Sequence, residues 1–228
     1  MTIKTYYQDE QATIYLGDCR EILPQLEKVD LVLTDPPYDQ KTHEGARTIS
    51  QDKKLVDFKA VTATDIKELF GLIKLQGWLV ATVDWRHCLT LEQDPPDNLR
   101  FVRFGIWDKP TYTPQFTGDR PATGWEAIAI MHSIGGRMKW NGGGTRAVWK
   151  FNKEHTNEHP TQKPEELYQT FVKLFSQESA IVLDPFMGSG TTLVAAKNLG
   201  RKAIGIELEE KYCEIAVKRL RQQTLFGV

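Results

Sequence analysis

Short apolar runs alternate with amphipathic stretches along most of this chain. Seven runs have the length of a strand, at residues 12–17, 29–34, 78–83, 101–107, 126–131, 180–183 and 202–206. Stretches typical of helices lie at residues 19–26, 65–77, from 164 onward, at 191–199 and around 210–221. The second stretch repeats apolar residues at helical spacing, and Gly77 is expected to end it. This alternation predicts an α/β fold, a doubly wound and mainly parallel sheet of seven strands with helices on both faces.

The composition is typical of one globular domain. The chain has 228 residues, of which 40% are hydrophobic and 26% charged, and its net charge is −1. This length suffices for a single domain over residues 1–228. No apolar run approaches the roughly 18 residues that a membrane-spanning helix needs, and no signal region follows Met1. We therefore expect a cytoplasmic protein with no membrane partner.

Cysteine usage argues against two kinds of structure. The chain has three cysteines, Cys19, Cys88 and Cys213, and none forms a Cys-x-x-Cys pair. An odd number without such pairs argues against a disulfide framework and against a zinc ribbon. We expect reduced, buried thiols and no metal site.

Two acidic strings follow apolar runs and are the candidate functional sites. Asp35-Pro36-Pro37-Tyr38 comes after the run at 29–34, and the string from Asp184 to Thr191, DPFMGSGT, follows the run at 180–183. Both acids therefore fall at the carboxyl ends of expected strands. Ligands of open α/β sheets bind at those ends.

The first string suits chemistry on an exocyclic amino group of adenine or cytosine. The nitrogen lone pair of such a group is delocalised into the ring, so the group is a poor nucleophile. Two hydrogen-bond acceptors, the Asp35 carboxylate and the Pro36 carbonyl, could return the lone pair to nitrogen. The prolines restrict the backbone, and Tyr38 supplies an aromatic face for the base. By itself, the string is also compatible with a simple capped turn.

The second string is typical of a cofactor-binding turn. Gly188 and Gly190 can adopt positive φ and let the backbone approach a ligand. Glu207 lies 23 residues beyond Asp184, at the end of the next expected strand, where an acid holds ribose hydroxyls. Leu193 stands where a dinucleotide fingerprint requires its third glycine, and the chain has no phosphate-loop string.

Together with a third string, the order of these motifs indicates a family. His159-Pro160-Thr161-Gln162-Lys163-Pro164 separates the Asp35 string from the later glycine turn. In this order, the three strings resemble the permuted β class of S-adenosylmethionine-dependent DNA amino-methyltransferases, which modify N6 of adenine or N4 of cytosine. In that family the sheet has the strand order 3-2-1-4-5-7-6 with one antiparallel strand. The resemblance implies a circularly permuted, Rossmann-like sheet whose chain starts on strand 3 and finishes on strand 2.

The resemblance also implies roles for individual residues. The catalytic string is Asp35, Pro36, Pro37 and Tyr38. The residues expected to bind S-adenosylmethionine are Asp18, Cys19, Asp35, Lys163, Asp184, Phe186, Gly188, Ser189, Gly190, Thr191 and Glu207. Asp18 would read the cofactor's adenine amino group, although it would equally well cap the following helix. Both roles are open at this point.

A small insert at about 132–158 is expected to recognise the target. No acidic residue occurs between Ala127 and Lys153, and the same stretch carries five cations, Arg137, Lys139, Arg146, Lys150 and Lys153. These five are the candidate DNA-binding residues, because cations neutralise phosphates. The alternative is a solvated loop. Residues 39–60 are polar and without period, and are expected to form a long loop.

The sequence thus predicts an enzyme that methylates N6 of adenine in double-stranded DNA, with the target base flipped from the duplex. N4 of cytosine is the alternative; Asp at position 35 favours adenine by resemblance only. A non-catalytic DNA-binding module and an RNA or protein amide methyltransferase are further alternatives. The intact Asp35 string argues against the module, and the motif order against the amide enzyme. A bacterial or bacteriophage setting, a homodimer and a cognate restriction nuclease are left open by the resemblance.

Overall fold

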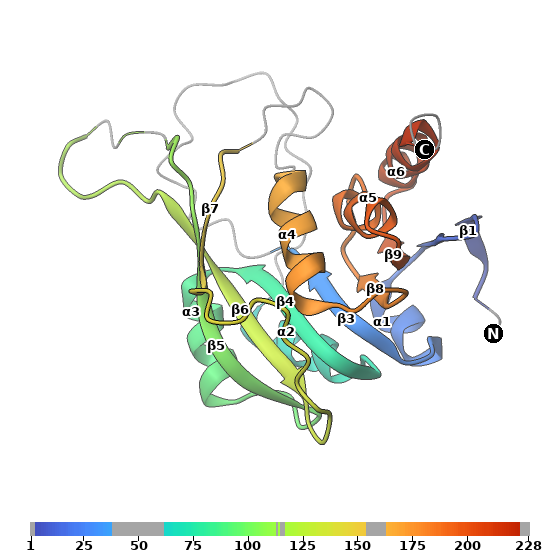
Figure 1. The fold of residues 1–228 in the computed structure, drawn as a ribbon, viewed down its shortest axis with the longest axis horizontal. Coiled ribbons are helices and arrows are strands. Elements are labelled where there is room, and N and C mark those ends of the chain that lie inside the picture. Colours follow the sequence, from blue (N-terminus) through green and yellow to red (C-terminus); the bar gives the residue numbers. More distant parts are fainter. Residues whose placement is uncertain (1–2, 38–61, 113, 115–116, 154–162, 224–228) are drawn as a thin grey trace.

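One twisted sheet runs through the whole molecule (Figure 1). The computed structural model describes residues 3–37, 62–112, 114, 117–153 and 163–223. Tyr38, the segment 39–60 and residues 159–162 lie outside this part of the chain. Within it, the sheet has nine strands in the order β1-β2-β9-β8-β3-β4-β6-β5-β7.

The strands and helices have the following bounds. The strands are β1 (Thr5–Gln8), β2 (Ala12–Leu16), β3 (Val29–Thr34), β4 (Leu75–Val83), β5 (Leu99–Asp108), β6 (Trp125–Ser133), β7 (Val148–Lys150), β8 (Ile181–Asp184) and β9 (Lys202–Glu207). The helices are α1 (Cys19–Ile22), α2 (Ala63–Gly71), α3 (Trp85–Gln93), α4 (Glu165–Phe175), α5 (Thr191–Asn198) and α6 (Glu210–Gln223), and a 3₁₀ turn, η1 (Leu23–Gln25), follows α1.

Most neighbouring strands are parallel, as expected. Strand β6 is antiparallel to both β4 and β5, while β2, β9, β8, β3 and β4 pair in parallel. The seven central strands therefore have the order and the single antiparallel member that the family resemblance predicts. Two further strands extend the edges: β1 pairs antiparallel with β2, and β7 pairs in parallel with β5.

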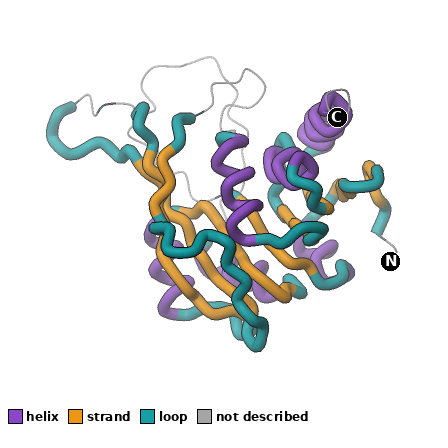
Figure 2. Tube along the Cα trace, viewed as in Figure 1, coloured by secondary structure: helices purple, strands orange, loops and turns teal. Residues whose placement is uncertain are grey.

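Helices cover both faces of the sheet, and the alternation of side chains along the strands explains why. In β3, Leu31 and Leu33 join a buried cluster with α4, α5 and α6, whereas Val32 joins a second cluster with α1, α2 and α3. Side chains along a strand point to opposite faces. A strand buried on both faces must therefore be apolar throughout, and both layers are visible in Figure 2.

The position of the site follows from how β3 and β8 are connected. From β3 the chain passes through α2 to β4, on one side; from β8 it passes through α5 to β9, on the other. Because β3 and β8 are neighbours, this is the point where the winding direction reverses. Such a switch point leaves a crevice outside the carboxyl ends of the two strands.

Besides the two added strands, local structure differs from the sequence prediction at two helices. Gly77, expected to end a helix, lies within β4, and α2 ends at Gly71. The sequence pattern does not predict helix α3, because its apolar residues are not confined to one face: Cys88 and Leu91 are buried while Trp85 is exposed. The available signal was Asp84, whose carboxylate accepts a hydrogen bond from the Arg86 backbone N–H at 2.8 Å and caps the helix.

Two further expectations concern the burial of the cysteines and the absence of a membrane-spanning helix. All three cysteines are buried and none is bridged. Among the described helices, none is long and apolar enough to cross a membrane.

The close approach of two strands at Gly77 makes a prediction about stability. A Cβ at this position would lie 2.0 Å from the carbonyl oxygen of Asp30 in the neighbouring strand. Gly77→Ala should therefore cost about 2 kcal/mol or more of unfolding free energy, because backbone must move. Gly71→Ala is the control: its Cβ would meet only Pro96 at 4.0 Å, so it should be neutral or stabilise by up to about 1 kcal/mol. Urea unfolding measures both; equal effects would contradict this explanation.

Candidate active site

Four acidic residues lie at or just beyond the carboxyl ends of neighbouring parallel strands. Asp18 follows β2, Glu207 ends β9, Asp184 ends β8 and Asp35 follows β3. The structure thus brings both sequence motifs to one end of the sheet, where the carboxyl ends of the parallel strands lie. Tyr38, the aromatic member of the first motif, lies outside the described residues.

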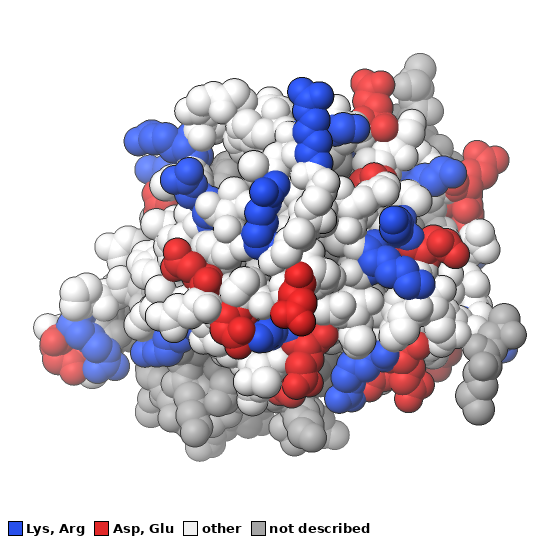
Figure 3. Space-filling model, turned by 90° about the horizontal axis from the view of Figure 1, so that it is seen from below, with Lys and Arg blue, Asp and Glu red and all other residues white. Residues whose placement is uncertain are grey.

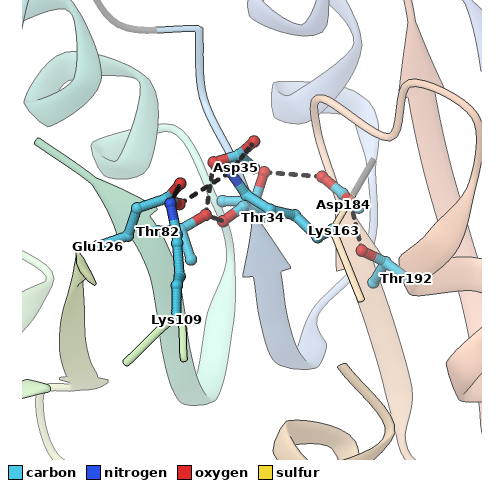
Figure 4. Close-up of polar contacts among 8 residues, drawn as sticks. All are labelled: Thr34, Asp35, Thr82, Lys109, Glu126, Lys163, Asp184 and Thr192. Atoms are coloured by element: carbon cyan, nitrogen blue, oxygen red, sulfur yellow. Dashed lines mark hydrogen bonds and ion pairs between the residues drawn. The ribbon is translucent and has the colours of Figure 1, made fainter. Parts of the chain in front are cut away.

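Asp35 is held by two polar groups from other elements (Figure 4). Its Oδ1 accepts a hydrogen bond from Thr82 Oγ1 at 2.5 Å, and its Oδ2 lies 2.9 Å from Lys163 Nζ. The side chain is 28% exposed, so it can still be reached from solvent. Burial raises the pKa of Asp35, and the ammonium group of Lys163 opposes that rise.

Lys163 also forms an ion pair with Glu126, which in turn pairs with Lys109; neither of these two residues belongs to a sequence motif. Lys163 Nζ also lies 3.0 Å from Glu126 Oε2, and Glu126 Oε1 accepts a hydrogen bond from Lys109 Nζ. Burial by itself would raise the pKa of Glu126, but the two ammonium groups overcome it and lower the value to about 2. Two carboxylates and two ammonium groups thus form a neutral cluster, so that each buried charge has a partner.

The members of this cluster come from adjacent strands rather than adjacent sequence. Asp35, Thr82, Glu126 and Lys109 lie in or just after β3, β4, β6 and β5, which are consecutive in the sheet. Sequence reasoning missed Thr82, Glu126 and Lys109, because spacing along the chain does not show which strands are neighbours. It assigned Lys163 to the cofactor, which stays a prediction; in the structure the lysine's ammonium contacts Asp35.

Asp184 joins the two halves of the site. Its buried carboxylate accepts hydrogen bonds from Thr34 Oγ1 at 2.7 Å, Thr192 Oγ1 at 2.5 Å and the Phe186 backbone N–H at 3.1 Å. Burial raises the pKa of Asp184 to about 6, although these donors favour the charged form. The carboxylate is thus already hydrogen-bonded within the protein, which favours a structural role for it.

The glycine turn has the backbone geometry that its sequence predicts. Gly188 has a φ of 51° and Gly190 a φ of 82°, both in the left-handed region. A Cβ on Gly190 would lie 2.8 Å from the Cβ of Ala216 in α6, whereas a Cβ on Gly188 would meet nothing within 4 Å. Gly190 is therefore needed for packing, while Gly188 leaves open space beside the turn.

Glu207 lies against that turn. Its Oε2 accepts a hydrogen bond from the Gly188 backbone N–H at 3.0 Å, and its Oε1 accepts from the N–H groups of Leu208 and Glu209. Burial raises the pKa of Glu207. A carboxylate fixed in this way has further lone pairs with which to accept hydrogen bonds from ligand hydroxyls.

Other predicted cofactor residues use their side chains within the protein. Arg219 of α6 donates hydrogen bonds to Ser189 Oγ at 3.3 Å and to Thr191 Oγ1 at 3.1 Å, and so fastens the turn to α6. The side chain of Phe186 packs against the core. Sequence reasoning did not identify Arg219, which lies in an ordinary amphipathic helix.

At the end of β2, both roles considered for Asp18 are compatible with the structure. Its carboxylate accepts a hydrogen bond from the Arg20 backbone N–H at 2.9 Å and caps α1. Its side chain remains 28% exposed. The neighbouring Cys19 is buried, which raises the pKa of its thiol to about 12. Any ligand contact of Cys19 would therefore involve its backbone.

The structure does not bring the five predicted DNA-binding cations together, although all five are exposed. Strand β6 is antiparallel to its neighbours. Arg137 and Lys139, which follow it, therefore lie at the end of the sheet opposite to Asp35, where the parallel strands begin. Arg146 precedes β7, alongside β5. Lys150 pairs in register with the last residue of β5, so it and the following Lys153 lie at the carboxyl edge.

The insert that carries these residues is packed against the domain. The carbonyl of Lys139 accepts a hydrogen bond from Trp78 Nε1 at 2.8 Å, and the N–H of Asn141 donates to the carbonyl of Leu174 in α4 at 3.1 Å. Trp149 is buried against Phe171. Seen from below, the surface has acidic and basic groups interspersed rather than one broad basic area (Figure 3).

Comparison with known proteins agrees with this arrangement. The N6/N4 DNA methylase family model matches residues 29–218. Type II methyltransferase M.HpaI of Haemophilus parainfluenzae is 44% identical over 221 residues, covering 84% of this chain and 68% of that protein. Type II methyltransferase M2.LlaDCHI of Lactococcus lactis subsp. cremoris is 27% identical over 264 residues, covering 99% of this chain and 95% of that protein.

Solved structures show the same architecture. The M1.HpyAVI–SAM complex superposes with a TM-score of 0.71 at 28% identity, covering 91% of this chain and 99% of the other. The cytosine-N4-specific PvuII methyltransferase has a TM-score of 0.73 at 17% identity, covering 95% and 89%; this likeness concerns the fold alone. The strand order, the two motifs at one sheet edge and the family match lead to one conclusion: the chain belongs to the DNA methyltransferase family that modifies N6 of adenine or N4 of cytosine.

Proposed function

We propose that this protein transfers a methyl group from S-adenosylmethionine to the N6 amino group of adenine in double-stranded DNA. The observation that carries the proposal is the position of Asp35. Its carboxylate lies at the switch point of the sheet, next to the glycine turn, and the Thr34–Asp184 hydrogen bond of 2.7 Å links the two motifs. An acceptor for the base and a turn for the cofactor are thus held at one edge.

The residues of the turn fit S-adenosylmethionine. The open space beside Gly188 admits a ligand close to the backbone. Glu207 offers a buried, oriented carboxylate for ribose hydroxyls, and Asp18 a partly exposed one for an adenine amino group. When bound, the cofactor supplies a methyl group activated by its sulfonium. The solved M1.HpyAVI relative in complex with SAM supports this assignment.

The chain's own residues would orient and activate the amino group. The Asp35 carboxylate and the Pro36 carbonyl accept hydrogen bonds from the two N–H groups of the amino group. These hydrogen bonds return the lone pair to nitrogen. Thr82 and Lys163 hold Asp35 in place, so little reorganisation is needed at the transition state. The nitrogen must lose a proton after methylation. Burial raises the pKa of Asp35 and makes it a better proton acceptor than an exposed aspartate.

The choice of base and the nature of the duplex contact complete the proposal. Asp at position 35 supports adenine over cytosine through the family resemblance. The target atom lies inside the duplex, so the base must flip into the crevice. Lys150 and Lys153 stand at the same edge as Asp35, where they can contact phosphates.

Asp35→Asn tests the chemistry, because it keeps the shape but replaces one acceptor oxygen with a donor. Single-turnover methyl transfer to DNA should fall by roughly 10²- to 10³-fold, while cofactor affinity changes little. The matched control is Asp30→Asn, at the other end of β3, where Asp30 accepts a hydrogen bond from the Ile181 N–H; it should retain the rate.

Mass spectrometry of the digested DNA identifies the product of this reaction. Wild-type protein should yield N6-methyladenine. N4-methylcytosine would contradict the choice of base but not the chemistry. Near-normal rates for Asp35→Asn would contradict the chemistry itself.

Gly188→Ala tests the cofactor turn. The added methyl group enters the open space beside the turn, so the affinity for S-adenosylmethionine measured by calorimetry should fall by about tenfold or more, equivalent to about 1.4 kcal/mol. Gly200→Ala is the matched control: Gly200 also has positive φ, 71°, with nothing within 4 Å of its Cβ position. It introduces similar backbone strain far from the turn. An equal loss of affinity in both variants would refute the site.

Neutralising single cations tests the DNA contact. Lys150→Gln or Lys153→Gln should weaken DNA binding and reduce the salt slope by about one for each phosphate that the protein no longer neutralises. Arg137→Gln and Lys139→Gln, at the opposite edge of the sheet, should leave the slope unchanged. Titrations at several salt concentrations measure this. A weakening confined to the second pair would place the duplex on the other edge.

A further inference from the structure

We propose that Glu126 and Lys109 are positioning residues: their ion pair holds Lys163 against Asp35, so that the catalytic carboxylate faces the target amino group. This inference rests on the proposed function and adds two residues that carry no sequence motif. Both act through Lys163.

The first argument is the geometry of Glu126. Its two oxygens are used separately: Oε1 accepts from Lys109, and Oε2 lies 3.0 Å from Lys163. Lys163 in turn lies 2.9 Å from Asp35. A lysine side chain is long and flexible, with considerable rotamer entropy. A second anion in contact with its ammonium therefore restricts where the group can lie.

The second argument is the burial of Lys109. The residue is 7% exposed, and its Nζ lies 4.5 Å from the centre of the Trp107 ring. A lysine so enclosed is poorly placed to contact a DNA phosphate. Burial lowers its pKa, and the Glu126 carboxylate opposes that change. The Lys109 ammonium thus points into the protein, where it holds Glu126 in place.

The direction in which the pKa of Asp35 changes distinguishes this positioning role of Glu126 from a simple effect of its charge. Besides burial, the Lys163 ammonium lowers the pKa of Asp35 and the Glu126 carboxylate raises it. If Glu126 acted only as a nearby negative charge, neutralising it would lower the pKa of Asp35. If it holds Lys163 in place, neutralising it releases the ammonium and raises the pKa of Asp35. The two explanations predict opposite directions.

Other titratable groups surround this cluster and must be considered in any titration. Tyr168 of α4 and Asp184 at the end of β8 interact electrostatically with Asp35. Lys153, after β7, lowers the pKa of Lys109. All three are retained in the variants below, so their contributions are common to every comparison.

The test is Glu126→Gln in the full-length protein, with two readouts. Carbon-13 NMR of labelled aspartate carboxyls follows the titration of Asp35, assigned by the loss of its signal in Asp35→Asn. Single-turnover methyl transfer gives the rate at saturating cofactor and DNA. We expect the Asp35 titration to move to higher pH and the rate to fall about 10- to 100-fold, with cofactor affinity unchanged. A titration that stays in place or moves to lower pH overturns the proposal.

Lys109→Met and Lys109→Arg provide a second comparison should Glu126→Gln not fold. The methionine variant should show the same two changes, and the arginine variant should restore both, because it keeps a cation beside Glu126. Lys197→Met is the matched control. The side chains of Lys197 and Lys109 are equally exposed, at 9%, and Lys197 Nζ lies 2.6 Å from Asp9 Oδ2, away from the site. Its removal should change neither readout.

The NMR readout does not depend on activity. If the wild-type protein methylated no DNA, the proposed function would fail, while the direction of the Asp35 titration would still decide the positioning role.

Discussion

The buried carboxylate of Asp184 connects the two halves of this molecule. Strands β3 and β8 share only two register pairs. Beyond them, side chains join the strands at both ends: Asp30 of β3 accepts a hydrogen bond from the Ile181 N–H, and the Asp184 carboxylate accepts hydrogen bonds from Thr34 at the end of β3 and from Thr192 in α5. A buried acceptor is tolerated only with its donors in place. The Asp184 carboxylate therefore helps to fix the position of the Asp35 motif relative to the glycine turn.

Around this junction, burial determines how the other acids behave. Asp35 and Glu207 both have raised pKa values because they are partly removed from water, yet their partners differ. Glu207 is held by backbone N–H groups, which fix it without adding charge. Asp35 is held by Lys163, whose ammonium is itself balanced by Glu126. The site thus keeps an oriented acceptor without leaving a buried charge unpaired.

The small insert between β6 and α4 is part of the packed domain. The segment after β6 passes along α4 and returns as β7, held by Trp149 and by backbone hydrogen bonds. Its tryptophans pack inward instead of forming a free stacking surface. The cations that the sequence places in one run are consequently divided between opposite edges of the sheet.

Side-chain periodicity and local backbone freedom are properties of the chain itself. They sufficed to predict the seven central strands, most of the helices between them, the glycine turn, and the placement of Asp35 and Asp184 at strand ends, but not α3 or the edge strands β1 and β7. The order of the motifs also indicated the family. The neighbours of each strand were settled only by the tertiary fold, which places Thr82, Glu126 and Lys109 around Asp35. The fold likewise separated Arg137 from Lys150. Strands adjacent in the sheet are distant in the chain, so contacts between them have no local sequence signal.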